Sequence, residues 1–309
     1  STSRLPPAVR FPLLIVLTTS ANSILFSLAS PFLGLELATI SRSLNEPWQV
    51  IATLAWAVFS LAVPWVMKLD DLDLACLTIL SQAPYYYLLN TFYGISLQAC
   101  LVPMAISAIS NSVPFRLLRP RIASHKYILE SAPHVSVANR DILTDLWTRI
   151  SVVCLGAATY GMVVFASFNT YLPAYLATHF EGLLTFERMY AIQYIPLAVS
   201  FLPIGWALYN FLFVPALGAK ASPYEKEAIE TFDPAQATFA ETIYYNIWGW
   251  DRGTKTLLQR TAVLVFFAGC ETFVRTATTI EGAETLGAAG WAAVWALSGA
   301  VTGAVYQWI

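Results

Sequence analysis

Charged side chains divide this chain into long stretches that are almost entirely apolar. A helix that crosses a membrane needs about 20 mostly apolar residues, and the stretch from Arg10 to Glu36 is long enough for one. The uncharged stretch from Asp73 to Arg116 is long enough for two helices joined by a turn at 90–94. Counting in this way predicts about eight transmembrane helices, at residues 11–33, 50–67, 74–89, 95–113, 150–178, 191–217, 261–280 and 286–309.

The amino-acid composition, together with the number of apolar stretches, indicates the fold class. Of the 309 residues, 57% are hydrophobic and only 12% are charged, whereas soluble domains carry about 25% charged residues. We therefore predict an all-α, polytopic integral membrane protein in which residues 1–309 form a single transmembrane domain surrounded by the lipid bilayer. The composition excludes an ordinary soluble enzyme and a disordered protein. The net charge of −2 offers no basic surface for a nucleic acid partner.

Lysine and arginine indicate the orientation. They are concentrated in two long loops, 114–149 and 218–260, and near the N-terminus at Arg4 and Arg10. Because positively charged loops stay on the cytoplasmic side, we predict an N-in, C-in arrangement with both long loops inside. We expect an internal membrane such as the endoplasmic reticulum, with the plasma membrane and a mitochondrial membrane as alternatives.

Each inside loop contains a segment with helical periodicity. Residues 136–147 predict a short amphipathic helix with Asn139 as its N-cap. Residues 235–247 predict a second interfacial helix beside a group of aromatic residues, which we expect at headgroup depth. These membrane-interface candidates are Tyr244, Tyr245, Trp248 and Trp250. A solvated loop helix with an aromatic core is the alternative.

The seventh predicted span contains two charged residues, Glu271 and Arg275. Measured from Thr261 at 1.5 Å per residue, they lie roughly 15 Å and 21 Å deep, and an ionisable residue at such depth costs at least about 2.5 kcal/mol. Their i,i+4 spacing places both on one helix face, with the acid before the base. The pair either locks this helix into the bundle or lines a cavity for a substrate, an ion or a proton.

Amides and prolines within the other predicted spans would add polarity to such a cavity. A proline inside a membrane helix frees backbone carbonyls that must be satisfied nearby, as expected at Pro84, Pro103, Pro196 and Pro203. The amides that we assign as cavity or transport candidates are Asn22, Gln82, Gln98, Asn169 and Gln193. Hydrogen bonding between helices is the alternative for each amide.

An acidic turn, Asp70, Asp71 and Asp73, precedes the third predicted span. Clustered carboxylates suit Mg²⁺ held together with a diphosphate. The placement resembles that of intramembrane prenyltransferases, which carry acidic motifs in their second and sixth inter-helix loops. That family's Asn-Asp-x-x-Asp-x-x-x-Asp motif is absent here, which leaves the metal assignment weak. The alternative is a solvated turn that caps the following helix.

The residues of common membrane catalysts are missing. The three histidines, His125, His134 and His179, all lie outside the middle of a predicted span, which excludes a bis-histidine haem or a membrane di-iron centre. The chain contains no Gly-x-Ser-x-Gly pattern and no Walker A pattern. We therefore name no catalytic residue and expect a protein that is not an enzyme.

The opening residues 4–12 (RLPPAVRFP) and the closing residues 287–295 (GAAGWAAVW) resemble an uncharacterised family of multi-span membrane proteins from filamentous fungi. The resemblance implies a multi-span fold and no particular activity.

The residues themselves favour a channel or transporter for an ion or small solute, with a polar cavity near Glu271 and Arg275. One alternative is a non-catalytic scaffold or subunit, partnered by a second copy of the chain or by a membrane complex. Another is a Mg²⁺-dependent enzyme that modifies isoprenoids or lipids through the acidic turn. Mg²⁺ is expected only under this last interpretation, and the other two require no cofactor.

Overall fold

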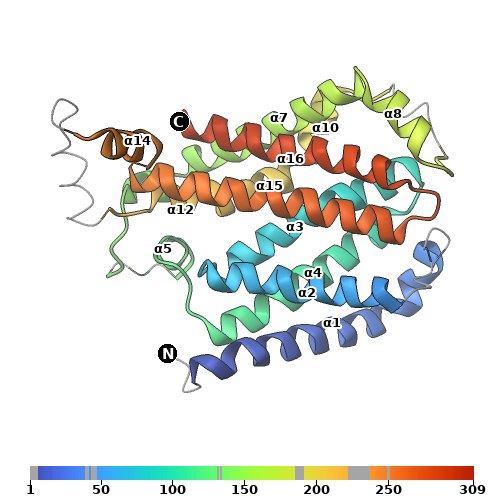
Figure 1. Cartoon of the computed structure of the whole chain (residues 1–309), viewed down its shortest axis with the longest axis horizontal. Coiled ribbons are helices and arrows are strands. Elements are labelled where there is room, and N and C mark those ends of the chain that lie inside the picture. The colour runs from blue at the N-terminus through green and yellow to red at the C-terminus, as the bar shows by residue number, and fades with distance from the viewer. Residues whose placement is uncertain are drawn as a thin grey trace.

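A computed structural model describes residues 6–38, 42, 47–130, 132, 134–184, 191–221, 237–248 and 251–309. Throughout these ranges the regular structure is helical, apart from one isolated β-bridge between Phe180 and Ala283. The all-α fold class is therefore confirmed. Figure 1 shows the long helices running side by side along the longest axis of the molecule.

Within the described ranges, seven helices have 20 or more residues, and shorter helices lie between some of them. The long helices are α1 (Pro7–Ala38), α2 (Pro47–Val66), α3 (Asp71–Phe92), α4 (Leu97–Leu118), α7 (Leu146–Phe168), α15 (Arg252–Thr279) and α16 (Thr285–Gln307). The short ones are α5 (Ala123–Glu130), α6 (Arg140–Thr144), α8 (Leu172–His179), α10 (Tyr194–Ser200), α11 (Leu202–Leu208), the π-helix η1 (Tyr209–Phe213), α12 (Val214–Leu217) and α14 (Phe239–Trp248).

Six of these helices, α1, α2, α4, α7, α15 and α16, are long and apolar enough to cross a membrane. A seventh crossing arises if α10 and the segment Leu202–Leu217, which meet at 53°, are counted as one broken span. The sequence predicted about eight. The remaining predicted span, 74–89, lies in α3, which is helical but is not among the helices that meet this test.

Helix α3 differs because it lies inside the bundle. It packs against α4, α15, α11 and η1, and most of its residues are buried, including the polar residues Ser81 and Gln82. A helix enclosed by other helices needs no continuous apolar surface, since its polar side chains face protein rather than lipid. Helix α3 is therefore the central helix of this part of the bundle.

Two predicted spans are shorter than expected, because the chain turns or bends within them. The fifth, predicted at 150–178, stops at Phe168, and a turn at 169–171 separates it from α8. The sixth, predicted at 191–217, breaks at Phe201 between α10 and α11. Pro203 explains the break, because its ring clashes with the preceding turn and it has no N–H to donate to Val199.

The helix predicted at 136–147 is shorter than expected. Helix α6 contains only Arg140–Thr144, and Asn139 has a left-handed backbone (φ 48°) without a side-chain cap. Asn139 therefore occupies the predicted N-cap position of α6, but its side chain makes no capping hydrogen bond. Asp145 interrupts the segment and caps α7 instead, because its carboxylate accepts a hydrogen bond of 2.7 Å from the backbone N–H of Thr148.

The two ends of the bundle carry different segments. Both termini, α5 and α14 lie at one end, and α8 lies at the other (Figure 1). The predicted inside loops therefore share an end with both termini. The turn predicted at 90–94 is also present, with Gly94 at φ +68° and the Asn90 side chain donating to the Ile95 carbonyl at 2.8 Å.

The predicted aromatic belt falls partly outside the described residues. Helix α14 confirms that residues 239–248 are helical, and the side chain of Tyr245 is half-buried. The side chains of Tyr244 and Trp248, and all of Trp250, lie outside the described part of the chain. Their placement at headgroup depth stays a prediction.

Candidate functional site

The acidic turn is the N-terminus of the central helix α3. Asp70 accepts a hydrogen bond of 2.9 Å from the Asp73 backbone, and Asp73 accepts one of 3.2 Å from the Asp70 backbone. This reciprocal arrangement is a capping box, which satisfies two of the free N–H groups at the helix start. The capping interpretation is confirmed. The expectation of a solvated turn is wrong, because Asp70 and Asp73 are both 0% exposed.

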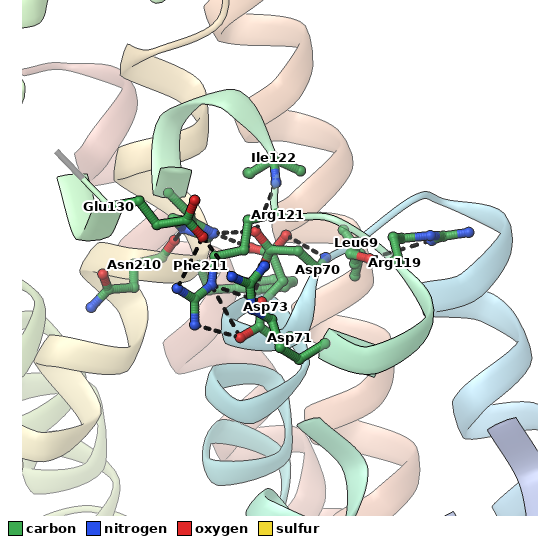
Figure 2. A network of polar contacts seen from close by, with 12 residues as sticks. Leu69, Asp70, Asp71, Asp73, Arg119, Arg121, Ile122, Glu130, Asn210 and Phe211 are labelled. Atoms are coloured by element: carbon green, nitrogen blue, oxygen red, sulfur yellow. Dashed lines mark hydrogen bonds and ion pairs between the residues drawn. The ribbon is translucent and has the colours of Figure 1, made fainter. Parts of the chain in front are cut away.

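Three cationic side chains compensate for the buried carboxylates (Figure 2). Arg260 of α15 donates from Nη1 and Nη2 to the two carboxylate oxygens of Asp73, at 2.5 and 2.9 Å. Arg121, which precedes α5, donates to Asp71 at 2.7 and 2.9 Å. His125 of α5 contacts Asp70 through Nδ1 at 2.8 Å. The charge network thus ties α15 and the α4–α5 segment to the start of α3.

His125 is an imidazolium in this arrangement. Its Nδ1 faces the Asp70 carboxylate, and its Nε2 lies 3.0 Å from the Asn210 carbonyl oxygen. Both partners are acceptors, so both ring nitrogens must carry a proton. Burial alone would lower the pKa of His125, but the negative charges of Asp73 and Asp70 outweigh it and the pKa is raised. Although burial opposes ionisation of Asp70, its hydrogen bond with His125 lowers the Asp70 pKa.

The broken sixth span supplies carbonyl groups to this network. Within η1 the N–H of Val214 donates to Tyr209, five residues back, which leaves the Asn210 carbonyl without its usual partner. The next residue, Pro215, has no N–H to donate to Asn210 or Phe211. Instead, Asn210 faces His125, and the Phe211 carbonyl accepts from Arg260 at 2.9 Å. The cations therefore satisfy backbone groups that the proline and the π-turn leave free.

The cluster Asp70, Asp73 and His125 brings three ligand atoms within 4.8 Å of one another, which is close enough to consider a metal ion. Every carboxylate oxygen of these two aspartates already accepts a hydrogen bond, from Arg260, His125 or a backbone N–H. Mg²⁺ prefers free carboxylates together with several waters. The residues present therefore do not fit the Mg²⁺ ion that the sequence suggested for this turn.

The second charged feature is the pair Glu271 and Arg275 on α15. The Arg275 Nε donates to one oxygen of Glu271 at 2.5 Å, and the indole N–H of Trp56 on α2 donates to the other oxygen. Trp56 also packs its ring against Phe267 of α15. The carboxylate is thus held by donors from two helices, and it connects α2 to the rest of the bundle.

Glu271 and Arg275 lie on the wall of a cavity of about 340 Å³. The wall is formed by side chains from α1, α2, α3, α4 and α15, and most of these side chains are polar. The polar ones are Thr18, Thr19, Asn22, Thr53, Ser60, Thr78, Ser81, Gln82, Ser107, Asn111, Glu271, Arg275, Thr278 and Thr279. A volume above roughly 300 Å³ is in the range of small-molecule sites.

The structure gathers only some of the amides that the sequence suggested. Asn22 on α1 and Gln82 on α3 lie on the cavity wall. Gln98 near the start of α4, Asn169 at the end of α7 and Gln193 before α10 are exposed and do not line it. These three amides lie at helix ends, and α7 and α10 contribute no residue to the cavity wall.

Two polar atoms on the cavity wall lack a partner. Among the described residues, Thr18 Oγ1 and Gln82 Oε1 are buried and accept or donate no hydrogen bond within the protein. Buried polar atoms normally find a partner, so each such exception needs an explanation. Because Thr18 and Gln82 both line the cavity, a water molecule or a bound solute is the candidate partner for each atom.

Helices α1 and α2 form the outer wall of the cavity. Only 11% of the apolar stretch of each is buried, compared with 50% for α16. Helix α1 packs mainly on α4, whereas α2 is joined to α15 chiefly through Trp56 and its neighbour Phe59. This side of the cavity is therefore the least tightly packed part of the bundle.

Sequence reasoning missed Arg121, His125 and Arg260 as partners of the acidic turn. On sequence alone, Arg121 and Arg260 belong to the predicted inside loops, and His125 has no assigned chemical role. The chain matches no known protein family, no curated protein and no solved structure. The resemblance to fungal multi-span proteins is therefore unsupported. Function is inferred from the geometry of the site alone.

Proposed function

We propose that this chain is a multi-pass membrane protein that moves a small solute through the cavity between α1, α2, α3, α4 and α15. The observation that carries the proposal is the cavity itself, about 340 Å³ in volume, in which 14 of the 24 lining residues carry a polar side chain. A polar wall inside a membrane protein costs free energy unless it serves a solute or a pathway. In this proposal eight helices cross the membrane, α3 and the broken sixth span included.

The direction of the cavity supports a pathway. Helices α3 and α15 run parallel, since contacts join Asp73 to Arg260, Ser81 to Thr272 and Tyr85 to Thr279. The lining extends along α15 from Phe267 to Thr279, roughly 18 Å at 1.5 Å per residue. On α3 the lining begins at Leu74, directly after Asp73, so this part of the wall lies next to the charge network.

The proposed topology places both termini on one side of the membrane. We expect a cysteine at exposed position 140 (Arg140→Cys) to react with an impermeant maleimide from the side of the termini. A cysteine at exposed position 181 (Glu181→Cys) should react only from the opposite side. The exposed Cys154 is first replaced by serine to remove its background labelling. Labelling of both introduced cysteines from one side would refute the number of crossings between them.

The Glu271–Arg275 pair separates transport from a purely structural role. Glu271→Gln alone should lower the melting temperature in detergent, because it leaves the partly buried Arg275 without its carboxylate. The double variant Glu271→Leu with Arg275→Met should recover most of that loss, since neither charge is left unpaired. If the cavity is a pathway, the double variant should fold but show altered solute flux in reconstituted vesicles.

The matched control is the exposed pair Arg116 and Glu130, which is 2.6 Å apart and lies outside the cavity. Glu130 also lies 3.6 Å from Arg121, so the control replaces Arg116 alone. Arg116→Met should leave flux and melting temperature near the wild-type values. A stable Glu271–Arg275 double variant with unchanged flux would favour a scaffold whose polar interior only locks its helices.

A further inference from the structure

We propose that the cavity is selective for an uncharged solute rich in hydrogen-bond donors, of the polyol class. This inference rests on the proposed function, because it names the kind of solute that the same cavity takes. It depends on three observations: the balance of charge on the wall, the state of its hydroxyl groups, and the two buried oxygen atoms without partners.

The cavity wall carries no net charge that could bind an ionic solute. Among the described residues that line the cavity, only Glu271 and Arg275 are charged, and they neutralise each other at 2.5 Å. Both carboxylate oxygens of Glu271 are occupied, one by Arg275 and one by Trp56. An anion or a cation inside the cavity would therefore lose its hydration without gaining an unpaired opposite charge, which is costly. This argument favours a neutral solute.

The hydroxyl groups on the wall present acceptors rather than donors. Thr53, Thr78 and Thr278 donate their hydroxyl protons to carbonyls within their own helices, at 2.9, 2.8 and 2.6 Å respectively. The Thr78 hydroxyl also accepts from the Asn111 side chain at 3.2 Å, so one of its lone pairs is already used. Ser60 on α2 does the same at 2.9 Å. A hydroxyl used in this way keeps lone pairs that can accept from another molecule. The wall consequently matches a molecule that brings its own donors.

The two unpartnered oxygen atoms also favour a solute that donates hydrogen bonds. Gln82 Oε1 is a pure acceptor, and Thr18 Oγ1 has two lone pairs as well as its proton. They belong to α3 and α1, which form different walls of the cavity, and both side chains are at least nine-tenths buried. A polyol has one O–H donor on each oxygen, so one molecule can donate to both walls. Its carbon skeleton can rest on apolar wall residues such as Leu54 and Val58 of α2.

The test uses the full chain in phospholipid vesicles, with xylitol as the neutral probe and KCl as the ionic one. Stopped-flow light scattering reports xylitol entry, and a potential-sensitive dye reports ion movement. We expect protein-dependent xylitol entry that saturates with concentration, and ion movement no faster than in empty vesicles. Xylitol should also raise the melting temperature of the protein in detergent, which measures binding independently of transport.

Two substitutions locate the site. Gln82→Leu and Thr18→Val each remove an oxygen that has no partner in the protein, so neither should lower the melting temperature. Each should raise the xylitol concentration for half-saturation by about tenfold, the effect of losing one hydrogen bond. Thr276→Val is the matched control, because Thr276 Oγ1 is also buried without a partner but lies off the cavity wall. It should leave xylitol entry unchanged.

The outcomes distinguish this inference from the proposed function. Potassium or chloride movement without xylitol entry or binding would overturn the inference and leave transport standing. Xylitol binding without any flux would support the inference and overturn transport. A folded protein that neither binds nor moves xylitol, and moves no ion, would overturn both. An equal effect of Thr276→Val and Gln82→Leu would also overturn the inference, because the cavity wall would then have no special role.

Discussion

Replacing Arg260 with methionine should lower the free energy of unfolding by about 3–5 kcal/mol, the usual cost of leaving a buried charge without its partner. Arg260 is only 7% exposed, and Asp73 is fully buried beneath it. The substitution also removes the donor to the Phe211 carbonyl, which Pro215 leaves without a helical partner. Chemical denaturation in detergent micelles, followed by tryptophan fluorescence, measures the change.

The exposed pair Arg116 and Glu130 provides the control. Arg116→Met removes an ion pair whose side chains are 43% and 31% exposed, and such pairs contribute about 0–1 kcal/mol. The double variant Asp73→Leu with Arg260→Met should regain part of the loss but not all of it. No charge is then unpaired, yet the Asp70 N–H and the Phe211 carbonyl still lack partners. An Arg260→Met cost no larger than that of Arg116→Met would contradict the buried network.

The free energy of unfolding should also fall at alkaline pH, because of His125. The pKa of His125 is raised in the folded protein, so the folded state holds the proton more tightly than the unfolded chain does. The resulting stabilisation is fully present below about pH 6.5, the ordinary value for histidine. It is lost as the pH rises through the raised pKa. Denaturation curves measured from pH 5 to 10 should therefore show stability declining in the upper part of this range.

Asp70 affects the free energy of unfolding at acid pH. Its pKa is lowered by its contacts with His125, so its contribution is present above about pH 3.9, the ordinary value for aspartate. That contribution is lost as the pH falls through the lowered pKa. The pair therefore stabilises the protein most between these two ordinary values. Nearby Arg260 opposes protonation of His125 but does not reverse the direction.

The variant His125→Gln should cost about 3–5 kcal/mol at pH 6, because Asp70 then remains buried without its cation. The loss should shrink at high pH, where the wild-type histidine is also neutral. His179 gives the matched control, since its contact with Glu284 is 2.6 Å long but partly exposed. His179→Gln should change stability by no more than about 1 kcal/mol. A wild-type protein with pH-independent stability above pH 6.5 would contradict the assignment of a charged His125.

Much of the fold can be predicted from local sequence pattern. Each of the eight apolar stretches contains helical residues, because a long apolar run without turn residues satisfies its backbone hydrogen bonds within one helix. The turn near Gly94 and the capping role of Asp70 were also predictable, since both depend on residues within a few positions of each other. The bounds of the fifth and sixth stretches were not, because the turn after Phe168 and the break at Phe201 end them early.

The candidate site was only partly predictable for a different reason. The spacing of Glu271 and Arg275 places them on one face of a helix, and Asn22 and Gln82 were recognised as polar residues within apolar runs. Whether a polar residue faces a cavity, lipid or another helix depends on where its helix ends and on which helices surround it. Gln98, Asn169 and Gln193 carry the same chemical groups as Asn22 and Gln82, yet they lie away from the cavity.

The sequence by itself determined an all-α protein with long apolar helices and two opposite charges at i,i+4 spacing. It offered an acidic helix cap as one of two interpretations of the turn at Asp70. Only the tertiary structure decided that this cap is buried and that Arg260, 187 residues away, neutralises Asp73. Only packing brought five helices around one polar cavity. The physical reason is the range of the interactions. Helix formation and capping depend on neighbouring residues, whereas burial and charge compensation depend on which helices come together.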